Sequence, residues 1–229
     1  MKPATQRFKV LWLLAASLAW CGTLIIVRTA WTKSFDYAFL VWNLALASIP
    51  LFFSTLMVWQ SRLLLRFLFG FLWLLFLPNA PYIITDFMHL RTLTSGPIWL
   101  DVLMLSSCAA TGLALGYCSI IQIHRSFNSA GKPRLGWILV ILSMFLSALG
   151  IYLGRLLRWR SIDFFRNPFG LLADIAERVL NPFAHYRAWA VILGFGTFLS
   201  LGYLFLTLGC KCPLTTSARR DFAEPVKQT

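Results

Sequence analysis

Six long runs without a single charged side chain constrain this chain more than any other feature of its sequence. Each run reaches the roughly 18 to 20 residues that an α-helix needs to cross the hydrocarbon core of a membrane. Only helices or closed barrels satisfy every backbone amide in hydrocarbon, and the runs lack the alternation of apolar and polar residues that marks a barrel strand. The sequence therefore predicts an all-α fold, a polytopic membrane bundle with about six transmembrane helices. The runs cover residues 10–27, 37–61, 67–85, 102–123, 135–154 and 188–210.

The composition supports the same fold class. Apolar residues make up 59% of the chain and charged residues 13%, against roughly 45–50% and 25% in a soluble domain. The net charge of +13 is carried mostly between the apolar runs, where basic residues set topology and contact lipid phosphates. We therefore expect the lipid bilayer and its anionic headgroups as partners, and no nucleic acid.

One transmembrane domain is expected over residues 1–212, followed by a disordered cytoplasmic tail at 213–229. Basic residues are more numerous in the loops that share a side with the N-terminus, which predicts a plasma-membrane protein with both termini in the cytoplasm. Residues 169–180 place charged and apolar side chains on opposite faces, as in a short interfacial helix. The expected spans are 10–27, 37–59, 64–84, 100–123, 135–154 and 188–209.

The third span contains a break. Two prolines in Pro78-Asn79-Ala80-Pro81 remove backbone donors and bias the preceding residues away from helix. A broken helix at membrane depth is tolerated where it is buried in protein or lines a wet cavity.

Two glycine pairs favour close packing of the fourth and fifth spans. Gly112 and Gly116 are four apart, as are Gly150 and Gly154, and such spacing lets helix backbones approach. Since Arg155 follows Gly154 directly, we expect Asp101 of the fourth span to be its ion-pair partner.

Polar side chains gather on the predicted outer face. Arg155 and Arg158 are three residues apart and together can hold a phosphate or carboxylate. Alternatively, they pin helix ends by pairing with acids, or reach lipid phosphates. Asp86 and His89 have the spacing of acid/base or metal-ligand residues, but equally of structural ones. Asp101 opens the fourth span, where a carboxylate also interacts favourably with the helix dipole. No metal site, cofactor or catalytic residue is assigned, because no recognised metal or nucleophile motif accompanies them. The candidate site comprises Asn79, Tyr82, Asp86, His89, Asp101, Arg155, Arg158 and Asp163.

The segments Pro78 to Leu90 and Gly154 to Asp163, with the Trp-x-Asp opening of the fourth span, resemble the signature stretches of a bacterial and cyanobacterial multi-pass membrane family called domain of unknown function 1361. The chain departs from that pattern at Arg160, where Asn is expected, and at Ile162, where Trp is expected. The resemblance implies the architecture and the choice of site residues, and no activity.

Three functions remain open on the sequence. The first is a membrane protein whose outer site binds an anionic headgroup or small solute. The second is a membrane scaffold whose polar motifs only lock the fold, and the third is an enzyme acting on a lipid-linked substrate. The five cysteines give no disulfide framework and are expected to be free thiols.

Overall fold

A computed structural model describes residues 3–91, 97–157, 159 and 166–209. The expected tail at 213–229 and two candidate residues, Arg158 and Asp163, lie outside these residues. In sequence order, the elements are α1 (Pro3–Thr32), α2 (Phe39–Trp59), α3 (Leu63–Phe76), α4 (Asn79–Tyr82), the 3-10 helix η1 (Ile83–Arg91), α5 (Ile98–Ser129), α6 (Pro133–Arg155), α8 (Pro168–Leu180), α9 (Tyr186–Leu204) and the π-helical turn η2 (Phe205–Gly209).

The described part of the chain is helical and contains no strand, so the predicted all-α fold is confirmed. Six helical stretches in it are long and apolar enough to cross a membrane. They are Arg7–Thr32, Phe39–Trp59, Leu63–Leu90, Ile98–Ser129, Pro133–Arg155 and Tyr186–Leu208.

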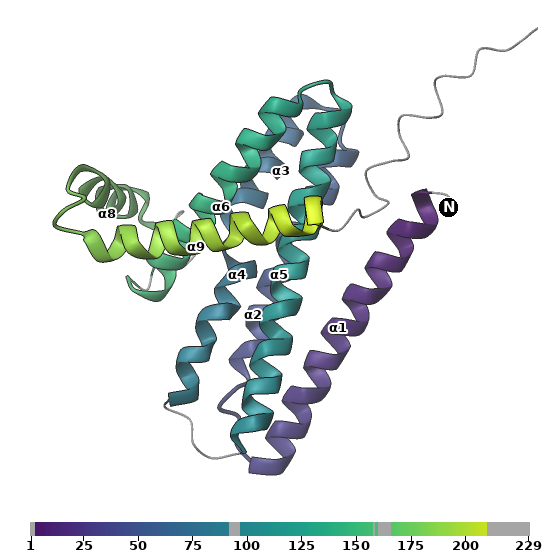
Figure 1. Cartoon of the computed structure of the whole chain (residues 1–229), viewed down its shortest axis with the longest axis vertical. Coiled ribbons are helices and arrows are strands. Elements are labelled where there is room, and N and C mark those ends of the chain that lie inside the picture. Colours follow the sequence, from purple (N-terminus) through teal and green to yellow (C-terminus); the bar gives the residue numbers. More distant parts are fainter. Residues whose placement is uncertain (1–2, 92–96, 158, 160–165, 210–229) are drawn as a thin grey trace, which may run out of the picture.

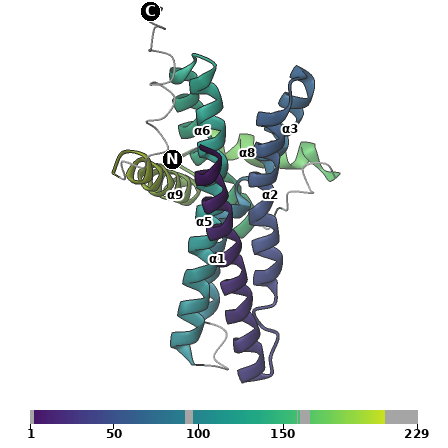
Figure 2. The same ribbon diagram turned by 90° about the vertical axis from the view of Figure 1, so that its right-hand side faces the viewer.

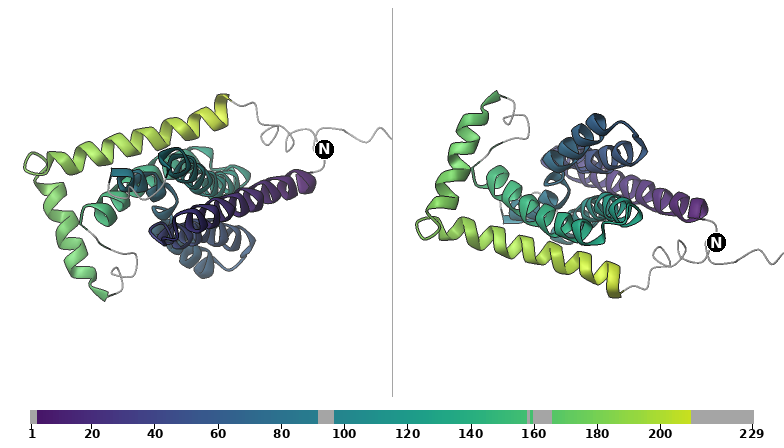
Figure 3. Two further views of the ribbon diagram at one scale, coloured as in Figure 1. Left: turned by 90° about the horizontal axis from the view of Figure 1, so that it is seen from below. Right: turned by 90° about the horizontal axis from the view of Figure 1, so that it is seen from above.

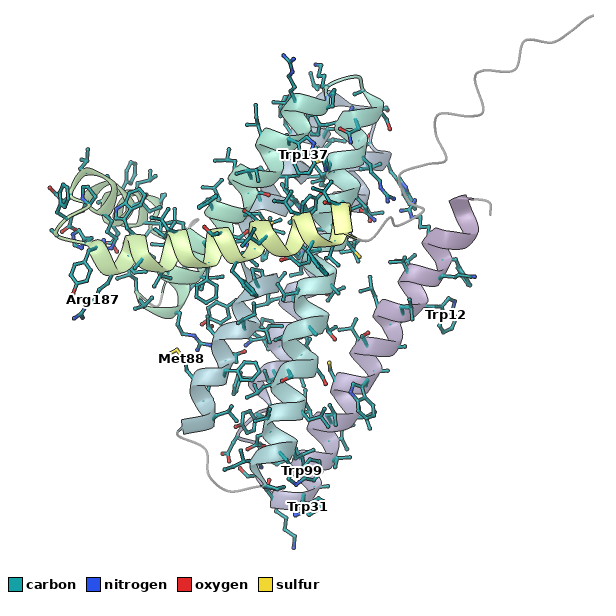
Figure 4. All side chains as sticks on the ribbon, viewed as in Figure 1. Trp12, Trp31, Met88, Trp99, Trp137 and Arg187 are labelled. Carbon is teal, nitrogen blue, oxygen red and sulfur yellow. The ribbon has the colours of Figure 1, made fainter. Side chains whose placement is uncertain are left out.

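The long helix α5 is the centre of the bundle. Helices α1, α2, α4 and α6 all pack against it, and α9 packs on α6 (Figure 1). Figure 2 shows the same bundle from the side, with α1 in front of α5. The interior is filled by side chains such as Leu40, Met104 and Leu105, whereas large apolar side chains such as Trp12 and Trp31 point away from the bundle (Figure 4). Such an outward apolar surface is what lipid tails require.

The expected break in the third span is present, but the chain stays helical through it. α3 ends at Phe76, and the backbone at Leu77 and Pro78 keeps right-handed helical dihedrals before α4 begins. The amide of Ala80 donates to the Leu77 carbonyl at 3.1 Å rather than to that of Phe76. The Phe76 carbonyl instead accepts a bond of 2.9 Å from Nδ2 of Asn79. The side chain of Asn79 thus replaces a backbone donor that the tightened turn has displaced.

The two glycine pairs serve the break rather than a direct contact between the two spans. A methyl group added at Gly112 would lie 2.6 Å from the Ala80 carbonyl oxygen, and one added at Gly150 would lie 2.5 Å from Cγ of Pro78. Helices α5 and α6 are in contact, as expected, but these glycines make room for the chain from Pro78 to Tyr82 that is wedged between them. Glycine is required there because any side chain would push the broken segment outward.

The short helix expected at 169–180 is α8, which lies beside the ends of α6 and α9 (Figure 3). Leu171 and Ile175 pack against the bundle, and the indole nitrogen of Trp159 donates to the Asp174 carboxylate at 2.8 Å. Leu172 is exposed although it is apolar, because it follows Leu171 by one residue around the helix and so points away from the packed face.

Candidate functional site

Arg155, the last residue of α6, reaches the segment that follows the break. Its guanidinium forms an ion pair with the Asp86 carboxylate, and its Nε donates to the Thr85 hydroxyl at 2.8 Å. A longer contact of 3.5 Å joins its Nη1 to Nε2 of His89. The guanidinium also lies over the ring of Tyr82, 4.7 Å from the centroid, which is cation–π geometry. Four side chains from the broken third span therefore surround one cation from α6.

Helix α2 supplies the second partner of the carboxylate. The other oxygen of Asp86 accepts a hydrogen bond of 2.8 Å from Nδ2 of Asn43. The ring of Phe39, also from α2, lies 4.9 Å from the ring of His89, measured between centroids. The orientation of Asp86 is thus fixed from both sides, by α2 and by α6.

The two charges of this pair differ in exposure. The Asp86 side chain is 1% exposed, whereas that of Arg155 is 18% exposed. A guanidinium has five N–H donors, and the contacts to Thr85, Asp86 and His89 engage three of its nitrogens with one bond each. A cation held by a buried carboxylate, with donors left on an open edge, is chemically able to bind a second anion.

A second ion pair joins α1 to α5. Nε of Arg28 donates to the Asp101 carboxylate at 2.6 Å, and another guanidinium nitrogen donates to the Thr32 hydroxyl. The hydroxyl of Tyr37 donates to the other Asp101 oxygen at 3.4 Å, and the Tyr37 ring lies 5.1 Å from the Arg28 guanidinium carbon. This pair is closed on every side, since Arg28 is 1% exposed and Asp101 2%.

Tyr37 lies between α1 and α2, and its pKa is raised above the ordinary value of a tyrosine. Burial, reinforced by the neighbouring Asp101 carboxylate, raises the pKa of Tyr37 to about 12. The phenol therefore keeps its proton and stays a donor over the physiological pH range.

The expected pair between Arg155 and Asp101 is wrong. Arg155 binds Asp86, and Asp101 binds Arg28. The physical reason is that α1 extends to Thr32, beyond the apolar run that ends at 27, so Arg28 is a buried helical residue and not a loop charge. Arg28 lies against the start of α5 and forms its ion pair with Asp101 there.

The structure divides the predicted site residues into three groups. Tyr82, Asp86, His89 and Arg155 come together, and Asn79 supports the same segment from the break. Asp101 belongs to the other ion pair. Arg158 and Asp163 fall outside the described residues.

Sequence reasoning missed five residues of the two ion-pair networks, namely Arg28, Thr32, Tyr37, Asn43 and Thr85. Asn43 carried a usable signal, because an amide inside an apolar span needs a buried hydrogen-bond partner. Thr85 precedes Asp86 directly and lies within the segment Pro78 to Leu90, but a threonine at this position carries no charge that would mark it as a partner of Arg155. Arg28 gave no local signal, because a cation at the end of an apolar run is ordinary.

The break is also flanked by a small apolar cavity between Leu77 and Pro81 of the third span and Tyr117 of α5. At about 10 Å³ it is at the lower limit for one water molecule, so it offers no room for a solute. Among the described residues, no cluster of three or more His, Cys, Asp or Glu side chains has the geometry to hold a metal ion.

The fold and these contacts define a class of protein. The chain's described residues are all-α, with six helical stretches compatible with a membrane protein, and two arginine–aspartate pairs with buried carboxylates lie among them.

The chain belongs to the family described as "Protein of unknown function (DUF1361)", which matches residues 42–201. This confirms the resemblance to that family. The match includes Asn43, Asp86, Asp101 and Arg155 but begins after α1, so Arg28 lies outside it. No curated protein and no solved structure matches the chain.

Proposed function

We propose that this protein is a six-pass protein of the plasma membrane, with both termini in the cytoplasm, whose Arg155 site binds an anionic group on the outer side. The ligand is a phosphate or carboxylate, carried by a lipid headgroup or by a small solute. One observation carries the proposal: the buried Asp86 holds a guanidinium that remains 18% exposed. The open edge of this guanidinium is where a second anion can bind.

The surroundings of Arg155 support this reading. Thr85 and Asp86 fix the guanidinium, which reduces the entropy lost when a ligand binds. His89 lies beside it, with its Nε2 3.5 Å from Nη1 of Arg155. Met88, next to His89 on the same short helix, is exposed and points away from the bundle (Figure 4).

The test is anion binding by the purified protein in nanodiscs of neutral phosphatidylcholine. Inorganic phosphate is titrated in one series and phosphatidylglycerol is added to the disc in another, and bound anion is measured in each. We expect Arg155→Gln to weaken binding by about tenfold or more, equivalent to about 1.4 kcal/mol or more. Arg187→Gln is the matched control, because Arg187 is an exposed cation near the start of α9 (Figure 4).

The two series separate the sources of the anion. Binding of phosphatidylglycerol alone identifies a lipid headgroup, and binding of inorganic phosphate identifies a solute. Equal binding by wild type and Arg155→Gln, or an equal loss in Arg187→Gln, would remove Arg155 from the proposal.

Topology has its own test. A reporter that is active only in the periplasm, fused after Thr229, should be inactive. An active reporter would place the C-terminus outside and reverse the side assigned to Arg155.

A scaffold function is the second candidate, and the Arg28–Asp101 pair favours it. That pair is sealed from solvent and connects α1 to α5 without an open donor edge. If Arg155→Gln alters neither anion binding nor any cellular phenotype, the scaffold reading takes its place.

A further inference from the structure

Two cysteines face each other in the contact between α1 and α5. Cys21 and Cys108 are both 0% exposed and belong to the same buried cluster. The Cys21 sulfur lies 3.4 Å from the Thr111 hydroxyl, which stands one helical turn beyond Cys108 on α5.

The register of the two helices independently places these thiols opposite each other. Arg28 of α1 contacts Asp101 of α5 at 2.6 Å, and the chain enters α5 from the end at which it leaves α1, so the two helices run antiparallel (Figure 1). Seven residues back from Arg28 is Cys21, and seven residues on from Asp101 is Cys108. Seven residues are about two helical turns, or roughly 10 Å, along each axis. The ion pair therefore sets a register in which Cys21 and Cys108 are directly apposed.

We propose that Cys21 and Cys108 form a redox pair that closes a disulfide between α1 and α5. The S–H bonds of both thiols break, one S–S bond forms, and two electrons and two protons pass to an oxidant. The oxidant we infer is a membrane-soluble quinone, which accepts two electrons and two protons and becomes a quinol.

The surroundings favour a disulfide over a metal at these sulfurs. The dithiol and the disulfide are both uncharged, so an apolar interior accommodates either state. A bis-thiolate complex of a soft monovalent metal would bury a net negative charge, and the nearest cation on this seam, Arg28, is already neutralised by Asp101. The products of the proposed step are therefore compatible with the site as it stands.

Helix α1 also provides a route for the oxidant. Its first half carries exposed apolar side chains, including Phe8, Trp12 and Leu13, and diverges from α5 toward the N-terminus (Figures 1 and 3). The proposed step requires an outward movement of this edge helix, which would expose Cys21 and Cys108 to the lipid phase, where quinones dissolve. Closing the disulfide then fixes α1 on the bundle covalently. This inference is independent of the proposed function of Arg155.

The experiment uses the full chain with Cys118→Ser, Cys210→Ser and Cys212→Ser, so that Cys21 and Cys108 are the only thiols left. The protein in nanodiscs is treated with decylubiquinone, denatured, alkylated with N-ethylmaleimide and weighed by mass spectrometry. We expect a chain that has lost two hydrogen atoms and takes no maleimide. Reduction with dithiothreitol before alkylation should restore two maleimide adducts.

The matched control adds Cys21→Ser to the same background. It should take one adduct with or without quinone, because a single thiol forms no bond within the chain. If the triple variant does not fold, peptide mapping of the quinone-treated wild type reports the same Cys21–Cys108 link.

Two outcomes would overturn the proposal. One is full alkylation of both thiols after quinone treatment, even if copper–phenanthroline closes the bond. The other is a link that forms only between two chains.

Discussion

The two buried ion pairs of this protein use the same chemistry in different surroundings. Arg28 and Asp101 are sealed on every side, and the cation is held by α1, the following turn and α5. Asp86 is as deeply buried, but its partner Arg155 keeps one edge open. A sealed pair is best suited to fixing helices, whereas a pair with an open cation is able to exchange partners. We therefore propose that the difference in exposure, and not the residue types, separates a structural role from a binding role.

The largest expected effect is on the sealed pair. Arg28→Gln leaves the Asp101 carboxylate buried without a counter-charge, which should cost about 3–5 kcal/mol of unfolding free energy. Replacing both residues, as Arg28→Met with Asp101→Leu, should cost much less because no charge remains buried. Denaturation in detergent measures both variants. Small, additive losses would mean that the pair is exposed to solvent in the membrane.

Breaking the Arg155–Asp86 pair should lower the free energy of unfolding by less. Arg155→Gln also leaves a buried carboxylate without its counter-charge, but the position of Arg155 is 18% exposed, so solvent offsets part of the penalty. The loss should be about 1.5–3 kcal/mol, below that of Arg28→Gln. Asp86→Asn in the same chain should recover part of it, and Asp101→Asn should recover none, because Asp101 belongs to the other pair. Unfolding of the two double variants compares the two acids. Recovery by Asp101→Asn would contradict the pairing seen here.

The next largest loss of stability is expected where Gly112 and Gly150 make room for the broken segment that leads to Asp86. Gly112→Ala and Gly150→Ala each press a methyl group into the broken segment at Ala80 or Pro78, at a cost of about 1–3 kcal/mol. Gly22→Ala is the control, since nothing lies within 4 Å of the added methyl, and helix propensity should make it neutral or slightly stabilising. Thermal melting compares the three variants. A control that melts as low as Gly112→Ala would show general helix sensitivity instead of a wedge.

The smallest effect concerns Tyr37. Its folded pKa of about 12 lies above the ordinary value of 10.0, so its contribution to stability is complete below pH 10 and is lost as pH rises through 12. Tyr37→Phe should lower stability by about 0.5–1.5 kcal/mol at pH 8, by removing one hydrogen bond to Asp101. The gap between wild type and variant should narrow toward pH 12. A gap that is constant over this range would show that the phenol does not face Asp101.

The fold was predictable because it depends on one strong signal. Uncharged runs long enough to span a membrane appear directly in the sequence, and the prolines at Pro78 and Pro81 mark the end of α3 within two residues. The predicted break did not show that Asn79 caps the Phe76 carbonyl, since that depends on how the tightened turn orients one side chain.

The site was predictable in part, for a physical reason. Tyr82, Asp86 and His89 occupy one short segment, so local spacing brings them together. The partner of Arg155 depends on which acid the packing of six helices places opposite it, and no local pattern encodes that choice. Asn43 and Arg28 lie on other helices than the acids they contact, so the identity of their partners emerges only from tertiary structure.

The most direct test of the division between the two pairs measures stability and anion affinity together, in one nanodisc preparation, for Arg28→Gln and Arg155→Gln. Arg28→Gln should lose the larger share of stability while its folded fraction keeps wild-type affinity for phosphate or phosphatidylglycerol. Arg155→Gln should lose about tenfold or more in affinity with the smaller loss of stability. Wild-type affinity in Arg155→Gln, or an affinity loss that follows stability equally in both variants, would contradict the account.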